Sequence, residues 1–457
     1  TRCEAGTVGG ALMLEGDATA VLRDSRVDLC SAATGGGAAV DASRLEMHNS
    51  SMTSNRASEN GGGISIAGGG MGSVWLVDSL IEDAVALKEG GGVFVEGGVL
   101  LLERSQILRC ATHYDGGGMA VLAGGAAELR ESTVVECAVH EIRGKGSALF
   151  VNFGASVVLR RTRIERCDSA MYGTVYVGGR LTLASSAIAH CVARDIGGSG
   201  SDYASRRGGV VWVVHGGVAR LTDSTIDDCH TYDASPTWHS SMTLRARSRR
   251  LAAPPEPSFA PVSVDPHGTL SLANTVFSNC TAQTGASAVF VSAEAHLRTA
   301  MLSLELPCLA GVPPAIHADR GADLSIRALS VSQPDNCRRA PAELAASAVS
   351  GAAATLGAGV SLVGGEQPGA GEAPASLCSA GTCATDAACT ADYEAMADAL
   401  MVTARCSCKP PNLPSPEAAS AELAPYEGGC LTPREGVTVS VPQAVAENVV
   451  IELSKTS

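Results

Sequence analysis

Aromatic side chains make up only 4 % of this chain, and its apolar stretches are too short to cross a membrane, which takes about 20 consecutive apolar residues. Basic residues are also in the minority, with 33 Lys and Arg against 47 Asp and Glu, for a net charge of −14. A nucleic-acid backbone needs a basic face, so the composition excludes a nucleic-acid partner. No Cys-x-x-Cys pair occurs, which removes the usual spacing of a metal site, and no motif for a cofactor is present.

What the chain does contain is glycine and small branched side chains. Its 457 residues include 52 Gly, and apolar residues reach 45 %. This length exceeds one ordinary hydrophobic core, and a core of small branched side chains interrupted by glycine is typical of short stacked strands. The composition therefore favours an array of repeats. Because the chain begins at Thr1 without a signal peptide, we expect it to be a processed or excised piece of a longer protein.

A repeat of about 27 residues runs along most of the chain. One unit contains Gly90-Gly91-Gly92-Val93-Phe94-Val95, then Leu100 to Leu102, then Ser105 to Cys110. The apolar residue three positions before the cysteine serves as an anchor for the alignment of the units. The anchors are Val27, Met52, Ile81, Ile107, Val134, Ile164, Ile188, Ile226 and Val276. Three short alternating runs per unit predict strands and no helix, so the sequence predicts an all-β fold, a right-handed parallel β-helix.

Glycine triplets mark one corner of each predicted coil. They occur at 35–37, 61–63, 90–92 and 116–118, and Gly144-Lys145-Gly146 and Gly208-Gly209 continue the series imperfectly. A tight corner needs positive φ or close approach of two backbones, which glycine permits. Only strands follow the triplets, so a phosphate-binding role is not expected.

The domain organisation follows from where the repeat is interrupted. We expect the β-helix over 1–365, with insertions at 196–207 and 231–265, a linker at 366–377, a cysteine-rich module at 378–430, and a further β-domain or linker at 431–457. The longer insertion contains the basic run 245–250, which is either a proprotein-type cleavage site, a docking segment for an acidic neighbour, or a solvated loop. Within the module, residues 391–404 have the spacing of a short amphipathic helix.

Sixteen cysteines, an even number, favour an oxidising compartment. Equivalent positions on neighbouring coils lie about 4.8 Å apart, within the Cα separation that a disulfide accepts. Asn55 and Ala84 occupy the cysteine position in two coils, and in the coil of Val276 that position falls on Asn279, one residue before the cysteine. The predicted pairs are Cys3–Cys30, Cys110–Cys137, Cys167–Cys191, Cys229–Cys280 and Cys308–Cys337. The alternative is a column of reduced, inward-facing thiols that pack as small apolar groups.

The pattern Ser-x-Ile-x-x-Cys/Asn followed by a glycine triplet resembles the GGA[ILV] and FxxN repeats of polymorphic outer-membrane-type proteins. The matching residues are Met52 to Asn55 with 61–64, and Val276 to Cys280. This resemblance implies a right-handed parallel β-helix and an adhesive or structural role at a surface. Cysteine in place of Asn departs from the bacterial pattern, and similar cysteine-bearing repeats occur in large surface proteins of algae and other protists.

The module at 378–430 resembles an EGF-like domain, with a Cys-x-Cys between its fourth and fifth cysteines. That resemblance, and not the spacing, implies the pairs Cys378–Cys389, Cys383–Cys406 and Cys408–Cys430. Calcium ligands before the first cysteine are not evident.

Some parallel β-helices are polysaccharide lyases or hydrolases, whose sites need two or three acidic residues converging on one face. The candidates are Asp227-Asp228 and His215. Adjacent residues of a strand point to opposite faces, so we expect no catalytic site, no cofactor and no metal. Charged residues beside the strands, such as Glu103, Arg104, Glu131, Arg160 and Arg161, are expected to form the solvated outer face.

The sequence thus predicts an extracellular structural or assembly module of a large cell-surface or surface-appendage glycoprotein, for example a flagellar hair. Its expected partners are other copies or subunits of the assembly. A glycan-binding adhesin is the alternative, and a β-helix enzyme comes third. Ordered exposed aromatics along one face would favour the adhesin. Two sequons, at Asn49 and Asn279, predict N-glycosylation.

Overall fold

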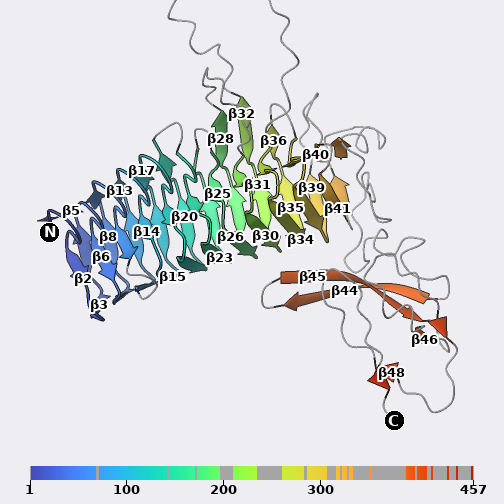
Figure 1. The fold of residues 1–457 in the computed structure, drawn as a ribbon, viewed down its shortest axis with the longest axis horizontal. Helices are drawn as coiled ribbons and strands as arrows, with labels where there is room; N and C mark the ends of the chain where they lie inside the picture. The colour runs from blue at the N-terminus through green and yellow to red at the C-terminus, as the bar shows by residue number, and fades with distance from the viewer. Residues whose placement is uncertain are drawn as a thin grey trace, which may run out of the picture.

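The computed structural model describes residues 2–67, 72–140, 144–169, 172–195, 209–233, 260–282, 286–305, 315–319 and 322–326, together with strands that lie between residues 329 and 455. Every regular element in these residues is a β-strand. Up to β43 all strand pairs are parallel, and each strand pairs with the equivalent strand of the next coil, so the chain forms a parallel β-solenoid (Figure 1). This confirms the all-β class and the coil of about 27 residues.

Three long sheets run along the rod, and each coil contributes one strand to each of them. Sheet 1 has twelve strands: β2 (Leu12–Leu14), β6 (Ala38–Asp41), β10 (Ile64–Ala67), β14 (Val93–Val95), β18 (Met119–Val121), β22 (Leu149–Val151), β25 (Val175–Val177), β29 (Val211–Val213), β33 (Val262–Val264), β37 (Val289–Val291), β40 (Ile316–Ala318) and β43 (Val349–Gly351).

Sheet 2 has eleven strands: β3 (Thr19–Arg23), β7 (Arg44–His48), β11 (Ser73–Val77), β15 (Val99–Glu103), β19 (Ala126–Arg130), β23 (Ser156–Arg160), β26 (Arg180–Ala184), β30 (Val218–Thr222), β34 (Thr269–Ala273), β38 (His296–Thr299) and β41 (Asp323–Ile326). Sheet 3 also has eleven: β4 (Arg26–Asp28), β8 (Ser51–Thr53), β12 (Leu80–Glu82), β16 (Gln106–Leu108), β20 (Thr133–Val135), β24 (Arg163–Glu165), β27 (Ala187–Ala189), β31 (Thr225–Asp227), β35 (Thr275–Ser278), β39 (Leu302–Glu305) and β42 (Leu329–Ser332).

Two shorter sheets complete the coils. Sheet 4 comprises β1 (Cys3–Glu4), β5 (Cys30–Ala32), β9 (Arg56–Ala57), β13 (Val85–Ala86), β17 (Ala111–Thr112) and β21 (Ala138–Val139). Sheet 5 comprises β28 (Val192–Asp195), β32 (His230–Asp233) and β36 (Thr281–Ala282). Strands β32 and β33 therefore extend into both ends of the insertion predicted at 231–265.

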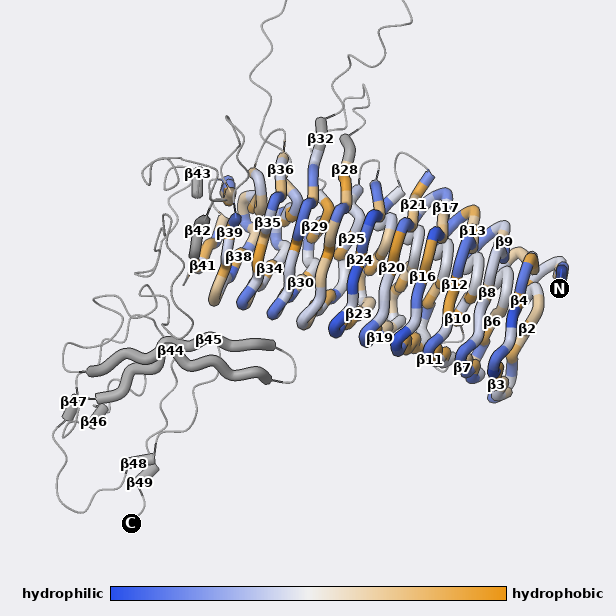
Figure 2. Tube along the Cα trace, turned by 180° about the vertical axis from the view of Figure 1, so that it is seen from behind, coloured by the Kyte–Doolittle hydropathy of each residue, from blue (hydrophilic) through white to orange (hydrophobic). Residues whose placement is uncertain are grey.

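The core is a set of apolar columns inside the coils. Sheet 2 strands such as β7 and β15 alternate buried and partly exposed residues, and Leu100 and Leu102 are fully buried. Figure 2 shows apolar and polar segments alternating along the coils. Burying one such leucine contributes about 1.5–3 kcal/mol, so regular stacking of these columns supplies most of the driving force for folding.

The glycine triplets form the predicted corner. The first glycine of each triplet has positive φ, as in Gly90 at +66° and Gly116 at +73°. The second allows close backbone approach, because a Cβ on Gly91 would lie 2.2 Å from the Gly117 carbonyl oxygen. Glycine is therefore required here by both conformation and space.

Two sequence-based expectations are wrong. The helix expected within 391–404 is replaced by two strands: β44 (Ala387–Met396) and β45 (Ala399–Cys408) form an antiparallel pair, because apolar residues there also fit strand alternation. The anchor placed at Val276 is also wrong, since Phe277 is the register partner of Ile226. Two further pairs near the C-terminus are β46 (Leu413–Pro414) with β47 (Cys430–Leu431) and β48 (Val439–Ser440) with β49 (Ser454–Lys455).

Candidate functional site

The cysteines of the solenoid form one inward-facing column, which we call the cysteine column. It consists of Cys110, Cys137, Cys167, Cys191, Cys229 and Cys280, each three residues after the anchor of its coil. All six side chains are buried. With Phe277 as the anchor, Cys280 lies in register and the one-residue offset predicted from Val276 disappears. At the N-terminal end, Cys3 and Cys30 are register partners in β1 and β5.

Hydrogen bonds connect most members of the column to the coil before them. The Cys137 N–H donates to Cys167 Sγ at 3.3 Å, and Cys167 Sγ lies 3.7 Å from the Val134 carbonyl oxygen. Burial raises the pKa of the Cys137 and Cys191 thiols, while the contact with Cys280 is the main cause of the raised pKa of Cys229. A thiol with a raised pKa is a poor nucleophile and a poor metal ligand, so Cys137, Cys191 and Cys229 are poorly suited to either role.

The sulfur atoms of the column stand in the structure as thiols. The in-register stacking on which the predicted disulfide pairs depend is present, and the pairing itself stays a prediction. Cys308, Cys337, Cys378 and Cys383 lie outside the described residues, so the fifth pair of the solenoid and the EGF-like pairing also stay predictions. The basic run at 245–250 lies outside them as well.

A second buried column explains the serine of the repeat motif. Ser50, Ser79, Ser105 and Ser132 stack on successive coils, and each hydroxyl accepts the N–H of the equivalent residue one coil earlier at 3.0–3.2 Å. Each hydroxyl also donates to the carbonyl two residues before it, as Ser105 Oγ does to Glu103 at 2.8 Å. The polar corner is thereby satisfied without water.

Two outward columns flank sheet 3, and all their members have positive φ without being glycine. In one column Arg104 pairs with Asp78 at 2.8 Å, and Arg161 pairs with Glu131 at 2.7 Å. The expected solvated outer face is thus organised into ion pairs between coils. The second column contains Asp83, Arg109, Glu136, Arg166, His190, Asp228 and Asn279.

In the second column, Arg109 pairs with Asp83 at 2.9 Å and Arg166 with Glu136 at 3.0 Å. Sequence reasoning missed these pairs, although charges of opposite sign at a fixed distance from the anchors were a usable signal. Exposed pairs of this kind contribute about 0–1 kcal/mol each, so they add little to the stability of the fold.

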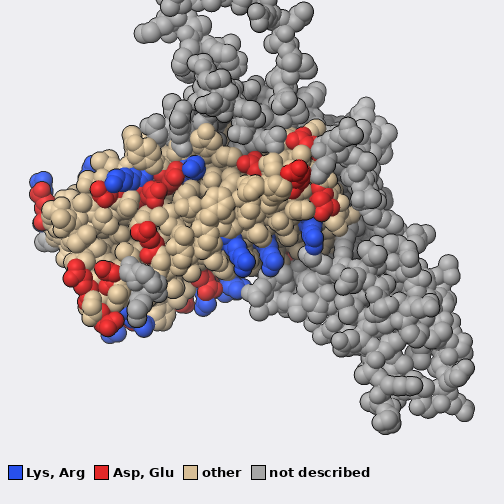
Figure 3. Space-filling view, in the orientation of Figure 1, with Lys and Arg blue, Asp and Glu red and all other residues tan. Residues whose placement is uncertain are grey.

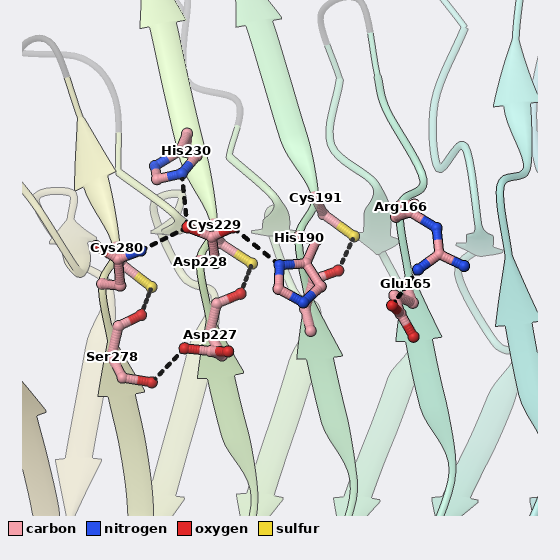
Figure 4. A network of polar contacts seen from close by, with 12 residues as sticks. Glu165, Arg166, His190, Cys191, Asp227, Asp228, Cys229, His230, Ser278 and Cys280 are labelled. Atoms are coloured by element: carbon pink, nitrogen blue, oxygen red, sulfur yellow. Dashed lines mark hydrogen bonds and ion pairs between the residues drawn. The ribbon is translucent and has the colours of Figure 1, made fainter.

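A polar network continues this column around Asp228 (Figure 4). Its carboxylate lies 2.9 Å from His190 Nδ1 and 3.1 Å from His230 Nε2, and it accepts a 2.6 Å bond from Asn279 Nδ2. The hydrogen bond with His190 is the main cause of the lowered pKa of Asp228. Neighbouring Asp227 accepts from Ser278 Oγ instead, at 2.6 Å.

The third enzyme candidate lies at another corner. His215 follows β29 of sheet 1, and its ring centroid lies 4.7 Å from that of His267. Asp228 follows β31 of sheet 3, so the two candidates lie at different corners of the coil. Among the described residues, no group of three or more His, Cys, Asp or Glu side chains is arranged to hold a metal ion.

An aromatic stack lies on the outer side of sheet 1. Phe150 and Tyr176 stack at 5.0 Å between ring centroids, and Trp212 contacts both Tyr176 and Tyr172. Tyr176 and Trp212 are only 8 % and 7 % exposed, and burial raises the pKa of Tyr176 to about 12. The rings are therefore ordered along one face, but they are packed and do not form an open platform for sugars.

Both predicted glycosylation sites lie on exposed corners. Asn49 donates to Asp24 at 2.7 Å, and Asn279 donates to Asp228. Each asparagine is exposed and sits beside sheet 3 with positive φ. Their modification stays a prediction.

No helix in the described part of the chain is long and apolar enough to cross a membrane. The sequence matches no protein-family model, no curated protein and no solved structure.

Proposed function

We propose that this chain is an extracellular structural module of a large cell-surface or surface-appendage glycoprotein, and that its partners are other copies or subunits of that assembly. In this proposal the chain has no enzymatic role. The rod is a right-handed β-helix of the polymorphic outer-membrane type, followed by an EGF-like module at 378–430.

The observation that carries the proposal is the unbroken column of six buried cysteines from Cys110 to Cys280. Six in-register members close into three disulfides between adjacent coils with none left over. Each would close a loop of about 25–50 residues and add roughly 3–4 kcal/mol in the chain-entropy model. Disulfides persist in oxidising compartments, which favours an extracellular location.

The experiment that tests the glycoprotein assignment uses the two sequons. The chain is expressed behind a secretory leader in a eukaryotic cell, and its intact mass is measured before and after treatment with a peptide N-glycosidase. We expect a glycan mass that disappears in the Asn49→Gln/Asn279→Gln variant. Secreted, folded protein without any mass shift would count against the glycoprotein assignment.

The structural role is tested on intact source cells. Proximity labelling around the chain is expected to identify a small, constant set of surface neighbours, including the chain itself. Labelling confined to cytosolic proteins would refute the proposal.

A glycan-binding adhesin is the second candidate. It is favoured by Arg180 and Arg220, two exposed arginines on the neighbouring strands β26 and β30 of sheet 2, whose sequences contain no Asp or Glu.

A further inference from the structure

The turns that join sheet 1 to sheet 2 carry exposed ring side chains on three coils. Phe153 lies between β22 and β23, His215 between β29 and β30, and His267 between β33 and β34. Phe153 is 51 % exposed, the His267 side chain is 53 % exposed, and His215 is also exposed. We call these three residues the aromatic corner. Unlike the packed rings on sheet 1, they present ring surface to solvent.

The coil between those of Phe153 and His215 has a shorter turn. Only Gly178 and Gly179 join β25 to β26, whereas four residues join β22 to β23 and β29 to β30. A Cβ on Gly178 would lie 3.5 Å from the Phe153 ring, and one on Gly216 would lie 3.9 Å from it. Because glycine has no side chain, the ring can approach both turns closely. The Phe153 ring therefore lies across the short turn and reaches the coil of His215.

The two histidines continue the corner toward the C-terminal end of the rod. The ring centroids of His215 and His267 are 4.7 Å apart, and the two rings are perpendicular. His267 Nε2 lies 3.2 Å from a Glu294 carboxylate oxygen, which orients the imidazole. The coils of Phe153 and His267 are three strands apart in sheet 1, which corresponds to about 14 Å along the rod. The aromatic corner is thus an extended surface that runs parallel to the rod axis.

The neighbours of the rings can form hydrogen bonds. Arg180 is exposed and follows the short turn directly as the first residue of β26, and the Glu294 side chain is 66 % exposed. Figure 3 shows further Lys and Arg side chains in a row along the lower side of the rod, where the strands of sheet 2 are labelled in Figure 1. Donors and an acceptor therefore stand beside the exposed rings.

This chemistry fits a sugar chain better than a protein surface. A hexose ring has one apolar face of C–H groups and a rim of hydroxyls, so it stacks on an aromatic ring whose neighbours bond to the hydroxyls. A protein interface needs a core of several large apolar residues. In the described turns between sheets 1 and 2, Phe153 is the only large apolar side chain that is exposed. The net charge of −14 disfavours an acidic polymer.

We propose that the aromatic corner binds a neutral hexose polysaccharide. One sugar ring stacks on Phe153, and the chain continues over His215 and His267 along the rod axis. Arg180 and Glu294 bond to its hydroxyls. This deepens the second candidate function above and depends neither on the structural role nor on the state of the cysteines. A failure to bind polysaccharide would leave the glycosylation and proximity-labelling tests of the structural role unaffected.

The test measures the retardation of the full chain by soluble polysaccharides in affinity gel electrophoresis, at low and at high salt. Hydroxyethylcellulose, galactomannan and dextran are the neutral probes, and polygalacturonate tests for attraction by charge alone. We expect at least one neutral polysaccharide to retard the protein equally at both salt concentrations, because stacking on an uncharged sugar is not screened by ions. Retardation by polygalacturonate alone, or by none of the probes, would overturn the proposal.

The variants Phe153→Ala and Phe153→Leu should each bind at least about tenfold more weakly than the wild type. Leucine keeps an apolar side chain over Gly178 but has no ring, so it separates the loss of stacking from the loss of packing. The matched control Tyr114→Ala removes a side chain that is 50 % exposed in the turn between β17 and β18. It should bind as the wild type does, and urea unfolding confirms that each variant is folded. Full affinity in either Phe153 variant, or equal weakening in Tyr114→Ala, would refute the assignment.

Discussion

Asn55 Oδ1 accepts a 2.9 Å hydrogen bond from the backbone N–H of Cys30, which lies one coil earlier. Asn55 Nδ2 also donates to the Val27 carbonyl at 3.2 Å. Cys167 makes the same two contacts, with the Cys137 N–H and the Val134 carbonyl. An amide and a thiol serve the same corner because each can accept one bond and donate another. The repeat therefore tolerates either residue, and the choice of cysteine adds the capacity to form disulfides.

Replacing Asn55 with alanine should destabilise the solenoid. The change leaves the Cys30 N–H and the Val27 carbonyl buried without their partner, which costs about 1–3 kcal/mol. Asn55→Cys should recover part of this loss under reducing conditions, because the thiol makes the same contacts. Urea unfolding of the three proteins measures the difference. Equal stability of Asn55→Ala and the wild type would show that these bonds contribute nothing.

Two glycine substitutions distinguish the cost of steric overlap from the cost of backbone strain at positive φ. Gly16 has φ +62° and a Cβ there would meet nothing within 4 Å, whereas a Cβ on Gly116 (φ +73°) would lie 2.6 Å from the Met119 carbonyl oxygen. Gly16→Ala should cost about 1 kcal/mol of unfolding free energy from backbone strain alone. Gly116→Ala should cost about 2–4 kcal/mol, because overpacking is added to the strain. Similar losses in both variants would mean that the corner relaxes freely.

The parallel solenoid could be predicted from the sequence because the anchors and glycine triplets repeat at one spacing. The alignment failed at Val276 because adjacent Val276 and Phe277 are both apolar, and only strand pairing identifies Phe277 as the buried residue. The ion pair between Asp83 and Arg109 joins residues of different coils, so it requires the register before it can be recognised. The helix predicted at 391–404 failed because Ala391, Tyr393 and Ala395 alternate with Asp392 and Glu394, which is a strand pattern.

The hydrogen bonds of Asp228 lead us to expect that the solenoid loses stability in acid. Its hydrogen bond with His190 lowers the pKa of the folded carboxyl below 3.8, so the folded state binds protons less readily than the unfolded chain. The stabilisation is present above about pH 4 and is lost as the pH falls through the folded pKa. The wild type should therefore lose stability relative to Asp228→Asn below about pH 4. If the unfolding free energies of the wild type and of Asp228→Asn changed with pH in parallel, this prediction would be wrong.

For Asp115 we expect the opposite dependence of stability on pH. Burial raises its pKa, and its carboxylate accepts the Lys145 N–H at 2.8 Å, a bond that an asparagine can also accept. Ionisation is disfavoured in the folded state, so the wild type should lose stability relative to Asp115→Asn as the pH rises above about 4. The same titration by urea unfolding serves both variants. A shift of the same sign for Asp115 and Asp228 would refute one of the two assignments.

In the extracellular rod that we propose, the members of the cysteine column form disulfides between adjacent coils. The direct measurement is the number of free thiols in the denatured, unreduced protein purified from the secretory pathway, followed by non-reducing peptide mapping. We expect almost no free thiol among the sixteen cysteines, with Cys110 linked to Cys137, Cys167 to Cys191 and Cys229 to Cys280. Free thiols at half or more of the sixteen positions would contradict both the staples and the extracellular assignment.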